Sequence, residues 1–358
     1  MSGRTFLLLM VVLAVTAVLS GCGPTAYKIT PIPASEELAE TTVRRDPGIL
    51  LPKIALVDIE GLIVNARESS LLGAGENPTA LAVEKLRKAA TDPWVKAVVL
   101  RINSPGGSVT ASDIIYHEVA RLRNGADGYP GKPVIAQILD VGASGGYYVA
   151  CAANEIRAEP TSVTGSIGVI MLKFDVSGLF EKVGVDTNVV KSGPLKDAGS
   201  PFRPMEPRER EMFQHLIDQF YEGFVAVVAA SRADLKIERV KELANGAIYS
   251  GLDARELGLI DGLGSLDEAL DRAKQIAGVD AARVVMYHRP VGYRGSIYSR
   301  IPDPQVERQA NPLIDLRLPE AFVSISSELS QEFREFERSS TVAANAFVGP
   351  KVSKYMSN

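Results

Sequence analysis

Two stretches of this chain repeat one arrangement, in which a short apolar run ends in a glycine turn and an amphipathic helix pattern follows. The first run, Ala97–Leu100, leads into a turn at 104–107. The second run, Val134–Leu139, leads into a turn at 142–146. Short apolar runs bounded by glycine are typical of buried strands, and their alternation with helices indicates an α/β fold. Such sheets carry their chemistry at the carboxyl ends of strands, so both turns are candidate parts of one site.

The surrounding pattern predicts one folded domain over residues 51–285. A further buried strand is expected at Ile54–Val57, and Thr110 is expected to cap the helix after the first turn. Further helices are predicted at Thr79–Ala90, Pro207–Ala230, Asp253–Leu257 and Leu266–Ala277. The long helix carries an apolar stripe of Phe213, Leu216, Ile217, Phe220, Phe224 and Val228. Residues 286–358 form a C-terminal tail to which the sequence assigns no role.

The N-terminus has the pattern of an export signal. Arg4 precedes the apolar segment Phe6–Val18, which is short for a membrane span of about 20 residues. The segment ends at Leu19–Cys22, which resembles the bacterial lipobox. We therefore expect a signal peptide over 1–21, a lipidated Cys22, and a flexible tether over 22–50. The domain is then expected to lie outside the cytoplasm, anchored to a membrane of a bacterial cell envelope. An uncleaved anchor helix remains the alternative.

The net charge and the few potential metal ligands argue against a nucleic-acid-binding protein and against a metalloprotein. The net charge of -4 and the lack of a dense basic run argue against nucleic-acid binding. Two cysteines and three widely spaced histidines give neither a disulfide framework nor a metal site. We expect no metal and no cofactor.

Ser144 is the candidate nucleophile. A reactive serine needs a base and N–H donors for the developing oxyanion. Ser144 lies between a predicted strand and helix with small neighbours, and its own N–H and that of Gly145 lie near the helix N-terminus. Gly106 and Gly107 of the first turn can supply an opposing N–H. The ordinary alternative for each turn, taken alone, is a capping serine or a simple strand-to-helix loop.

Several blocks of the chain resemble, in order, the signal peptide peptidase A family (SppA, protease IV). These blocks are Asn103–Ser108, Asp140–Ala150, Thr164–Val169, Lys191–Asp197, Ser200–Met205 and Gly246–Gly251. The resemblance covers roughly residues 52 to 285. It implies a crotonase/Clp-protease-like fold with repeated β-β-α units, peptide substrates such as cleaved signal peptides, and an octamer-like homo-oligomeric ring.

The same resemblance implies the site residues. Ser144 takes the nucleophile position, Lys196 that of the general base, and Ser166 that of a serine orienting the lysine. Gly106, Gly107 and Gly145 are the expected oxyanion donors through their backbone N–H groups.

Other chemistries remain to be weighed. A Ser–His–Asp triad of the Clp type needs a histidine soon after Ser144, and none lies between His117 and His215. Lys191 is a rival base but has the pattern of a solvated lysine. Cys151 is expected to be a buried structural thiol.

Two further alternatives concern the whole protein. A crotonase-type acyl-CoA enzyme would need a glutamate base, and a catalytically weak or dead scaffold would need neither Ser144 nor Lys196. Asp197 would disfavour a neutral Lys196 if it faced it, so we expect its carboxylate to point elsewhere.

Overall fold

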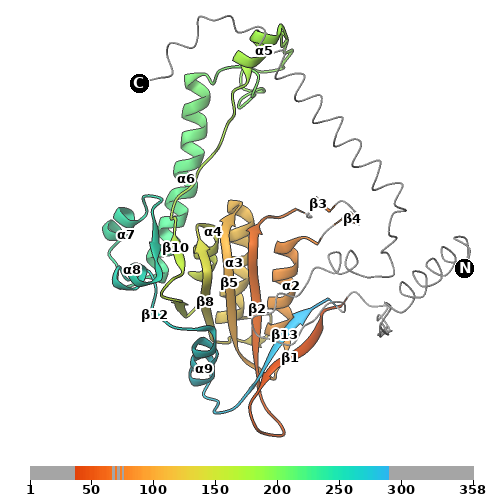
Figure 1. The fold of residues 1–358 in the computed structure, drawn as a ribbon, viewed down its shortest axis with the longest axis vertical. Helices are drawn as coiled ribbons and strands as arrows, with labels where there is room; N and C mark the ends of the chain where they lie inside the picture. The colour runs from red at the N-terminus through yellow and green to blue at the C-terminus, as the bar shows by residue number, and fades with distance from the viewer. Residues whose placement is uncertain (1–36, 67–68, 71–72, 75, 290–358) are drawn as a thin grey trace, which may run out of the picture. The chain divides into compact units, whose positions relative to one another are not determined.

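A mixed sheet of nine strands is the centre of the part that the computed structural model describes, residues 37–66, 69–70, 73–74 and 76–289. Its main path runs β1-β13-β2-β5-β8-β10-β11, and β9 and β12 pair off this path (Figure 1). The strands are β1 Ala39–Arg45, β2 Lys53–Ile63, β5 Val95–Gly107, β8 Val134–Ala143, β9 Glu155–Ala158, β10 Val163–Gly165, β11 Ile248–Ser250, β12 Gly262–Leu263 and β13 Arg283–His288. From β13 to β10 neighbouring strands are parallel, while β1 and β11 are antiparallel edges.

Helices bury both faces of this sheet. Pro78–Thr91 (α2), Val109–Asn124 (α3) and Gly145–Ala150 (α4) pack together and against β2, β5 and β8. Leu266–Ile276 (α9) packs against the same three strands. In β2, Ala55 and Val57 belong to the core under the first three helices, while the alternating Ile54 and Leu56 are buried outside it. Parallel strands covered on both faces are apolar throughout, which is why they appear as continuous apolar runs.

Three sequence expectations are corrected by this arrangement. The tether was expected to reach residue 50, but 39–45 form β1 and pair with β13. The first glycine turn was expected to break its strand, whereas β5 continues through 104–107 and pairs with the end of β2. The cap of α3 is Ser108, not Thr110. A strand on the edge of a sheet and a turn held by a neighbouring strand both depend on pairing that local patterns do not contain.

The chain also contains a region with different packing, residues 169–223, here called the arm. It holds Ser177–Val183 (α5) and most of the long helix Pro207–Ser231 (α6), which projects from the sheet with α5 at its far end (Figure 1). The predicted apolar stripe of α6 is buried only at its lower end, at Phe224 and Val228. Its upper members Leu216 and Phe220 are exposed.

The remaining described elements are small. Ile237–Leu243 (α7) and Gly251–Glu256 (α8) follow α6. The strands Ser69–Ser70 (β3) and Gly73–Ala74 (β4) form a two-stranded ribbon that belongs to a separate unit. No helix within the described ranges is long and apolar enough to cross a bilayer. The predicted signal peptide, Cys22 and most of the C-terminal tail lie outside the described residues.

Candidate active site

Ser144 joins the end of β8 to the start of α4 in a strained turn. Its backbone has φ 51 and ψ -120, a conformation that residues with a Cβ rarely adopt. Its N–H donates to the Gly165 carbonyl at 2.8 Å, which fixes the turn against β10. Although Ser144 occupies the N-cap position of α4, its side chain makes no capping hydrogen bond. The ordinary explanation of a capping serine therefore fails, and the strain resembles that of a nucleophile elbow.

The two glycine turns meet backbone to backbone. Gly106 has φ +100, and a Cβ built there would lie 2.6 Å from the Gly145 nitrogen. A Cβ on Gly145 would lie 3.2 Å from the Gly107 nitrogen. A Cβ on Gly146 would lie 2.7 Å from the Ser104 carbonyl oxygen. Only glycine allows this approach, which brings the backbone of the first turn beside the nucleophile.

The hydrogen bonds in these turns narrow the choice of oxyanion donors. The Gly106 N–H donates to Ser104 Oγ at 3.1 Å. The Ser144 N–H donates to the Gly165 carbonyl, and the Ile63 carbonyl accepts from the Ser108 N–H. Gly145 is the first residue of α4, where N–H groups lack partners within the helix. Gly107 and Gly145 are thus the best-placed donors of the three predicted glycines.

Ser166 lies next to this turn, directly after the end of β10. Its φ is +52, and its N–H donates to the Ala247 carbonyl at 2.7 Å. It follows Gly165, whose carbonyl holds Ser144, so the two serines are linked through one backbone bond. The structure therefore brings Ser144 and Ser166 to the same site.

A cavity of ≈ 560 Å³ opens beside Ser144. It is bounded by both glycine turns, the segment 166–170 that follows β10, one face of α6 and the 244–246 loop. One wall is aromatic, because Tyr148 packs edge-on against Phe224 with ring centroids 5.1 Å apart. The Tyr148 hydroxyl donates to Asp113 at 2.8 Å and so holds the ring in place. Such a wall suits apolar side chains of a bound chain.

Lys196 is not brought to this cavity. It lies in the arm on a series of turns over residues 193–200, where its N–H donates to the Gly193 carbonyl at 3.1 Å. Its side chain is exposed and it is not among the residues that line the cavity. Within one chain the structure therefore assembles Ser144, Ser166 and the glycine N–H groups without the expected base.

The rival residues lie elsewhere. Lys191 bonds Asp197 at 2.7 Å, and the other carboxylate oxygen of Asp197 accepts from Arg203 at 2.9 Å. The Asp197 carboxylate therefore bonds Lys191 and Arg203, which agrees with the expectation that it points away from Lys196. His117 is exposed and lies 3.4 Å from Asp113, and it does not line the cavity. His215 is exposed on α6 and His288 is buried on β13; neither lines the cavity.

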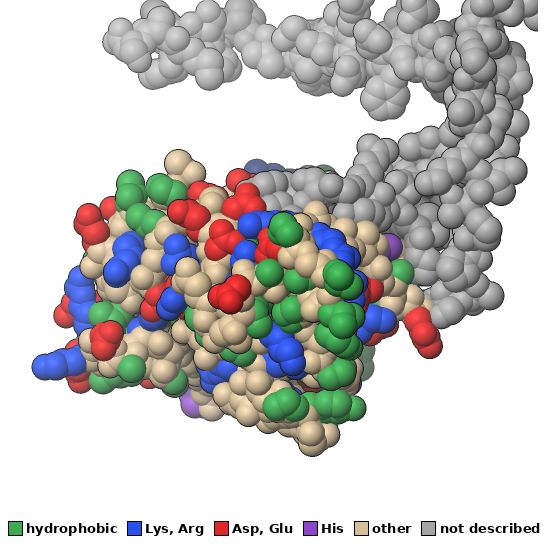
Figure 2. Space-filling view, turned by 90° about the horizontal axis from the view of Figure 1, so that it is seen from below, with side chains coloured by type: hydrophobic (Ala, Val, Ile, Leu, Met, Phe, Trp, Pro, Cys, Tyr) green, Lys and Arg blue, Asp and Glu red, His purple; other side chains and the backbone are tan. Residues whose placement is uncertain are grey.

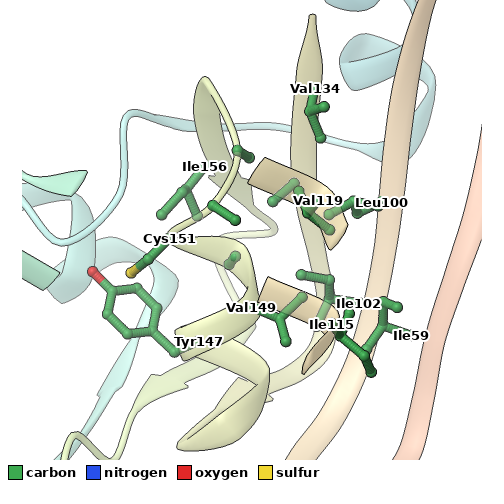
Figure 3. Close-up of a cluster of buried hydrophobic side chains, with 14 of the residues drawn as sticks. Ile59, Leu100, Ile102, Ile115, Val119, Val134, Tyr147, Val149, Cys151 and Ile156 are labelled. Atoms are coloured by element: carbon green, nitrogen blue, oxygen red, sulfur yellow. The ribbon is translucent and has the colours of Figure 1, made fainter. Parts of the chain in front are cut away.

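Cys151 is buried in the core beside Tyr147 (Figure 3). Burial raises the pKa of its thiol to about 12, so it stays protonated at neutral pH and is a structural residue, as expected. The residues lining the cavity include Asp218 but no glutamate. The glutamate base of a crotonase-type acyl-CoA enzyme therefore has no counterpart among them.

Known proteins similar to this chain include peptidases. The family model described as peptidase family S49 matches residues 127–280. A candidate signal peptide peptidase SppA of Enterococcus faecium is 36% identical over 253 residues, covering 71% of this chain and 71% of that protein. A candidate protease of Synechocystis sp. is 39% identical over 232 residues, covering 65% of this chain and 77% of that protein. The chloroplastic serine protease SPPA of Arabidopsis thaliana is 39% identical over 198 residues, which cover 55% of this chain but only 28% of that protein.

Proposed function

Because the chain belongs to peptidase family S49, with SppA among its relatives, we propose that it is a serine endopeptidase that hydrolyses cleaved signal peptides and other unfolded or membrane-held peptides. The family has a Clp-protease/crotonase-like fold, which the parallel sheet of this chain fits. The observation that carries the proposal is the strained turn at Ser144, which opens onto a cavity with its hydroxyl free of any capping role.

The proposed reaction proceeds through an acyl-enzyme. The Ser144 hydroxyl attacks the scissile carbonyl while its proton passes to the neutral amine of Lys196. The N–H groups of Gly107 and Gly145 stabilise the oxyanion, and the protonated lysine then gives its proton to the leaving amine. A water molecule activated by the same lysine releases the acyl group. No metal or cofactor takes part.

We further propose that Lys196 reaches Ser144 from a second copy of the chain. Two features of the arm support this. Lys196 is exposed on the arm and is not among the residues that line the cavity of its own chain. The arm also exposes large apolar side chains to solvent: Ile170, Leu172, Phe174, Leu179, Val189 and Val190. A surface of this kind is typical of a protein interface. A closed ring would give each site a lysine from its neighbour.

The membrane part of the proposal rests on the sequence. An apolar segment that ends at Cys22 supports lipid anchoring, with the peptidase domain outside the cytoplasm of a bacterium. Substrates left in a membrane would then be near the site.

The dyad is tested by two variants and their mixture. Ser144→Ala and Lys196→Ala should each lose nearly all peptidase activity while keeping the wild-type circular dichroism and melting temperature. If the dyad forms between chains, co-refolding the two inactive variants should restore about a quarter of wild-type activity, because some sites then combine an intact serine with an intact lysine. His117→Ala and His215→Ala serve as controls and should stay active.

The possible outcomes separate the claims. Full activity of Ser144→Ala would overturn the peptidase assignment and favour a scaffold protein. Inactive single variants whose co-refolded mixture assembles and stays inactive would overturn only the supply of Lys196 by a second copy.

A further inference from the structure

Arg203 is the centre of a charged cluster beside the turns that carry Lys196. Its Nε donates to Asp197 Oδ2 at 2.9 Å, and its Nη1 donates to Glu209 Oε2 at 3.1 Å. Its Nη2 bonds Glu209 Oε1 and also donates to the Asp197 carbonyl at 3.3 Å. All three guanidinium nitrogens are therefore used, and they join the Asp197 turn to the first turn of α6.

Glu209 is buried and Asp197 is largely shielded from solvent, although many residues of the arm around them are exposed. The side chain of Glu209 is 1% exposed and that of Asp197 is 11% exposed. Glu209 Oε2 also accepts the Glu206 N–H at 3.0 Å, which completes a capping box at the start of α6. Hydrogen bonds from Arg203 and then Lys191 hold the pKa of Asp197 far below its usual value. The hydrogen bond from Arg203 also lowers the pKa of Glu209. Both groups are anions at neutral pH.

This cluster decides where the charge next to Lys196 points. Asp197 directly follows Lys196, and its two carboxylate oxygens are occupied by Lys191 and Arg203. A carboxylate released from those partners could pair with the Lys196 ammonium. Such a pair favours the charged lysine, and only the neutral amine can accept the Ser144 proton. The other charged side chains of this cluster are Glu206, which lies 3.8 Å from Arg203, and Lys173, which donates to the Arg203 carbonyl.

We propose that Arg203 is a positioning residue for Lys196: it fixes the 193–200 turns to α6 and keeps the Asp197 carboxylate away from the lysine amine. The proposal rests on the proposed function, in which Lys196 is the general base. Arg203 itself touches no reacting atom. Arginine suits the task because its planar fork bonds both oxygens of Glu209 while its Nε bonds Asp197. The single nitrogen of a lysine does not offer this fixed, two-pronged geometry.

The test is the pH dependence of kcat/KM on an uncharged peptide substrate, measured with the full-length protein. In wild type the rate should rise with pH as the lysine loses its proton. Arg203→Met should move the midpoint of that rise upward by about one pH unit, because the freed Asp197 carboxylate favours the protonated lysine. Replacing Asp197 as well, in Arg203→Met/Asp197→Asn, should return the midpoint to the wild-type value. Asp197→Asn alone should leave the midpoint unchanged.

Control variants distinguish an electrostatic effect of Arg203 on Lys196 from a general loss of structure. Arg239→Met removes an exposed arginine that pairs with Glu242 on α7, and it should change neither the midpoint nor the rate. If Arg203→Met does not fold, Lys191→Met removes the other partner of Asp197 and should move the midpoint in the same direction by a smaller amount. A purely structural role of Arg203 would lower the rate at every pH and leave the midpoint where it is, which would overturn the proposal.

Failure of this inference can be told from failure of the proposed function. Lys196→Ala is measured in the same series. A Lys196→Ala protein as active as wild type would overturn the dyad itself. An inactive Lys196→Ala together with an unmoved midpoint in both Arg203→Met and Lys191→Met would overturn only the role of Arg203.

Discussion

The turn at Ser144 and the arm that carries Lys196 are built in opposite ways. Around Ser144, glycine backbones pack against each other, and the neighbouring side chains of Ala143, Tyr147 and Val149 are buried. In the arm, charged side chains lie inside and large apolar side chains lie on the surface. Asp197 and Glu209 lie inside an ionic cluster, while Val190, Ile170 and Phe174 are 102%, 82% and 75% exposed. The turn at Ser144 is closely packed within its own chain. The arm instead leaves large apolar side chains exposed to solvent.

The surface of the molecule on the side away from the arm does not have this pattern of buried charges and exposed apolar side chains. Seen from below, hydrophobic side chains lie interspersed with Lys, Arg, Asp and Glu (Figure 2). Scattered apolar groups of this kind are normal on a soluble protein and need no partner. The contrast teaches that the two members of the proposed dyad are held by different means: Ser144 by backbone packing, and the turns that carry Lys196 by an ion cluster.

The largest effect is expected from adding one methyl group beside Ser144. Alanine at Gly106 would have to adopt φ +100 and place its Cβ 2.6 Å from the Gly145 nitrogen, which is backbone and cannot move aside. Gly106→Ala should lower kcat/KM by about 100-fold or more, because it displaces the Gly145 N–H that is a proposed oxyanion donor, and should lower the melting temperature as well.

The matched control for Gly106→Ala is a glycine of the arm. A Cβ on Gly178 in α5 would meet no atom within 4 Å. Gly178→Ala should therefore keep the wild-type melting temperature. If both alanines are tolerated equally, the turn at Ser144 is not as tightly packed as described.

A smaller effect is expected from charges placed on the apolar surface of the arm. Phe174→Asp and Val190→Asp change side chains that are already exposed, so the melting temperature of the single chain should move by only a few degrees. Assembly should weaken because a buried carboxylate in an interface is costly, and activity should fall about tenfold with it. Light scattering and peptide hydrolysis at the same protein concentration measure both effects.

Leu50→Asp is the control for the arm variants, since Leu50 is 81% exposed on the loop between β1 and β2. It should leave both assembly and activity unchanged. Arm variants that remain fully assembled and active would show that the exposed apolar groups are not an interface.

The two regions also differ in how far the sequence predicts them. Strands β2, β5 and β8 and helices α2 and α9 were predicted because continuous apolar runs and helical periodicity are local signals. The position of Ser144 between strand and helix follows from the same signals. Its positive φ does not, because the Gly165 carbonyl that holds it belongs to another strand. The bond from the Gly106 N–H to Ser104 Oγ is local, but it depends on a side-chain rotamer that the sequence does not specify.

The arm was predicted less well for a physical reason. The apolar stripe of α6 has the spacing of a core face, and spacing alone cannot distinguish a core from a surface that another molecule covers. Leu216 and Phe220 belong to this stripe and are exposed, while Phe224 and Val228 of the same stripe are buried. The sequence block Ser200–Met205 was noticed, yet nothing in it indicated that Arg203 would bond residues six positions away on both sides.

The smallest expected effect concerns how the stability of the two regions depends on pH. Charged groups of the sheet region and of the arm should change the free energy of unfolding in different pH ranges. In the sheet region, Lys132 is buried and its Nζ donates to the Ala89 and Asp92 carbonyls, both at 2.6 Å. Burial lowers its pKa from 10.5 to about 8. Between pH 8 and 10.5 the unfolded chain holds this proton more tightly than the folded one, so the free energy of unfolding should increase as pH rises through that window. Thermal denaturation from pH 7.5 to 9.5 should show a relative gain of a few degrees in wild type that Lys132→Met lacks.

In the arm, the lowered pKa values of Asp197 and Glu209 act in the other direction. Their stabilisation is complete above the unfolded values of 3.8 and 4.5 and is lost as pH falls below them. The arm should therefore loosen in acid, while the sheet region gains stability in alkali. Lys236→Met, which removes an exposed lysine at the N-cap of α7, is the control and should keep the alkaline gain. If wild type and Lys132→Met have parallel melting profiles up to pH 9.5, Lys132 keeps its proton in the folded chain, and the difference between the two regions is one of packing alone.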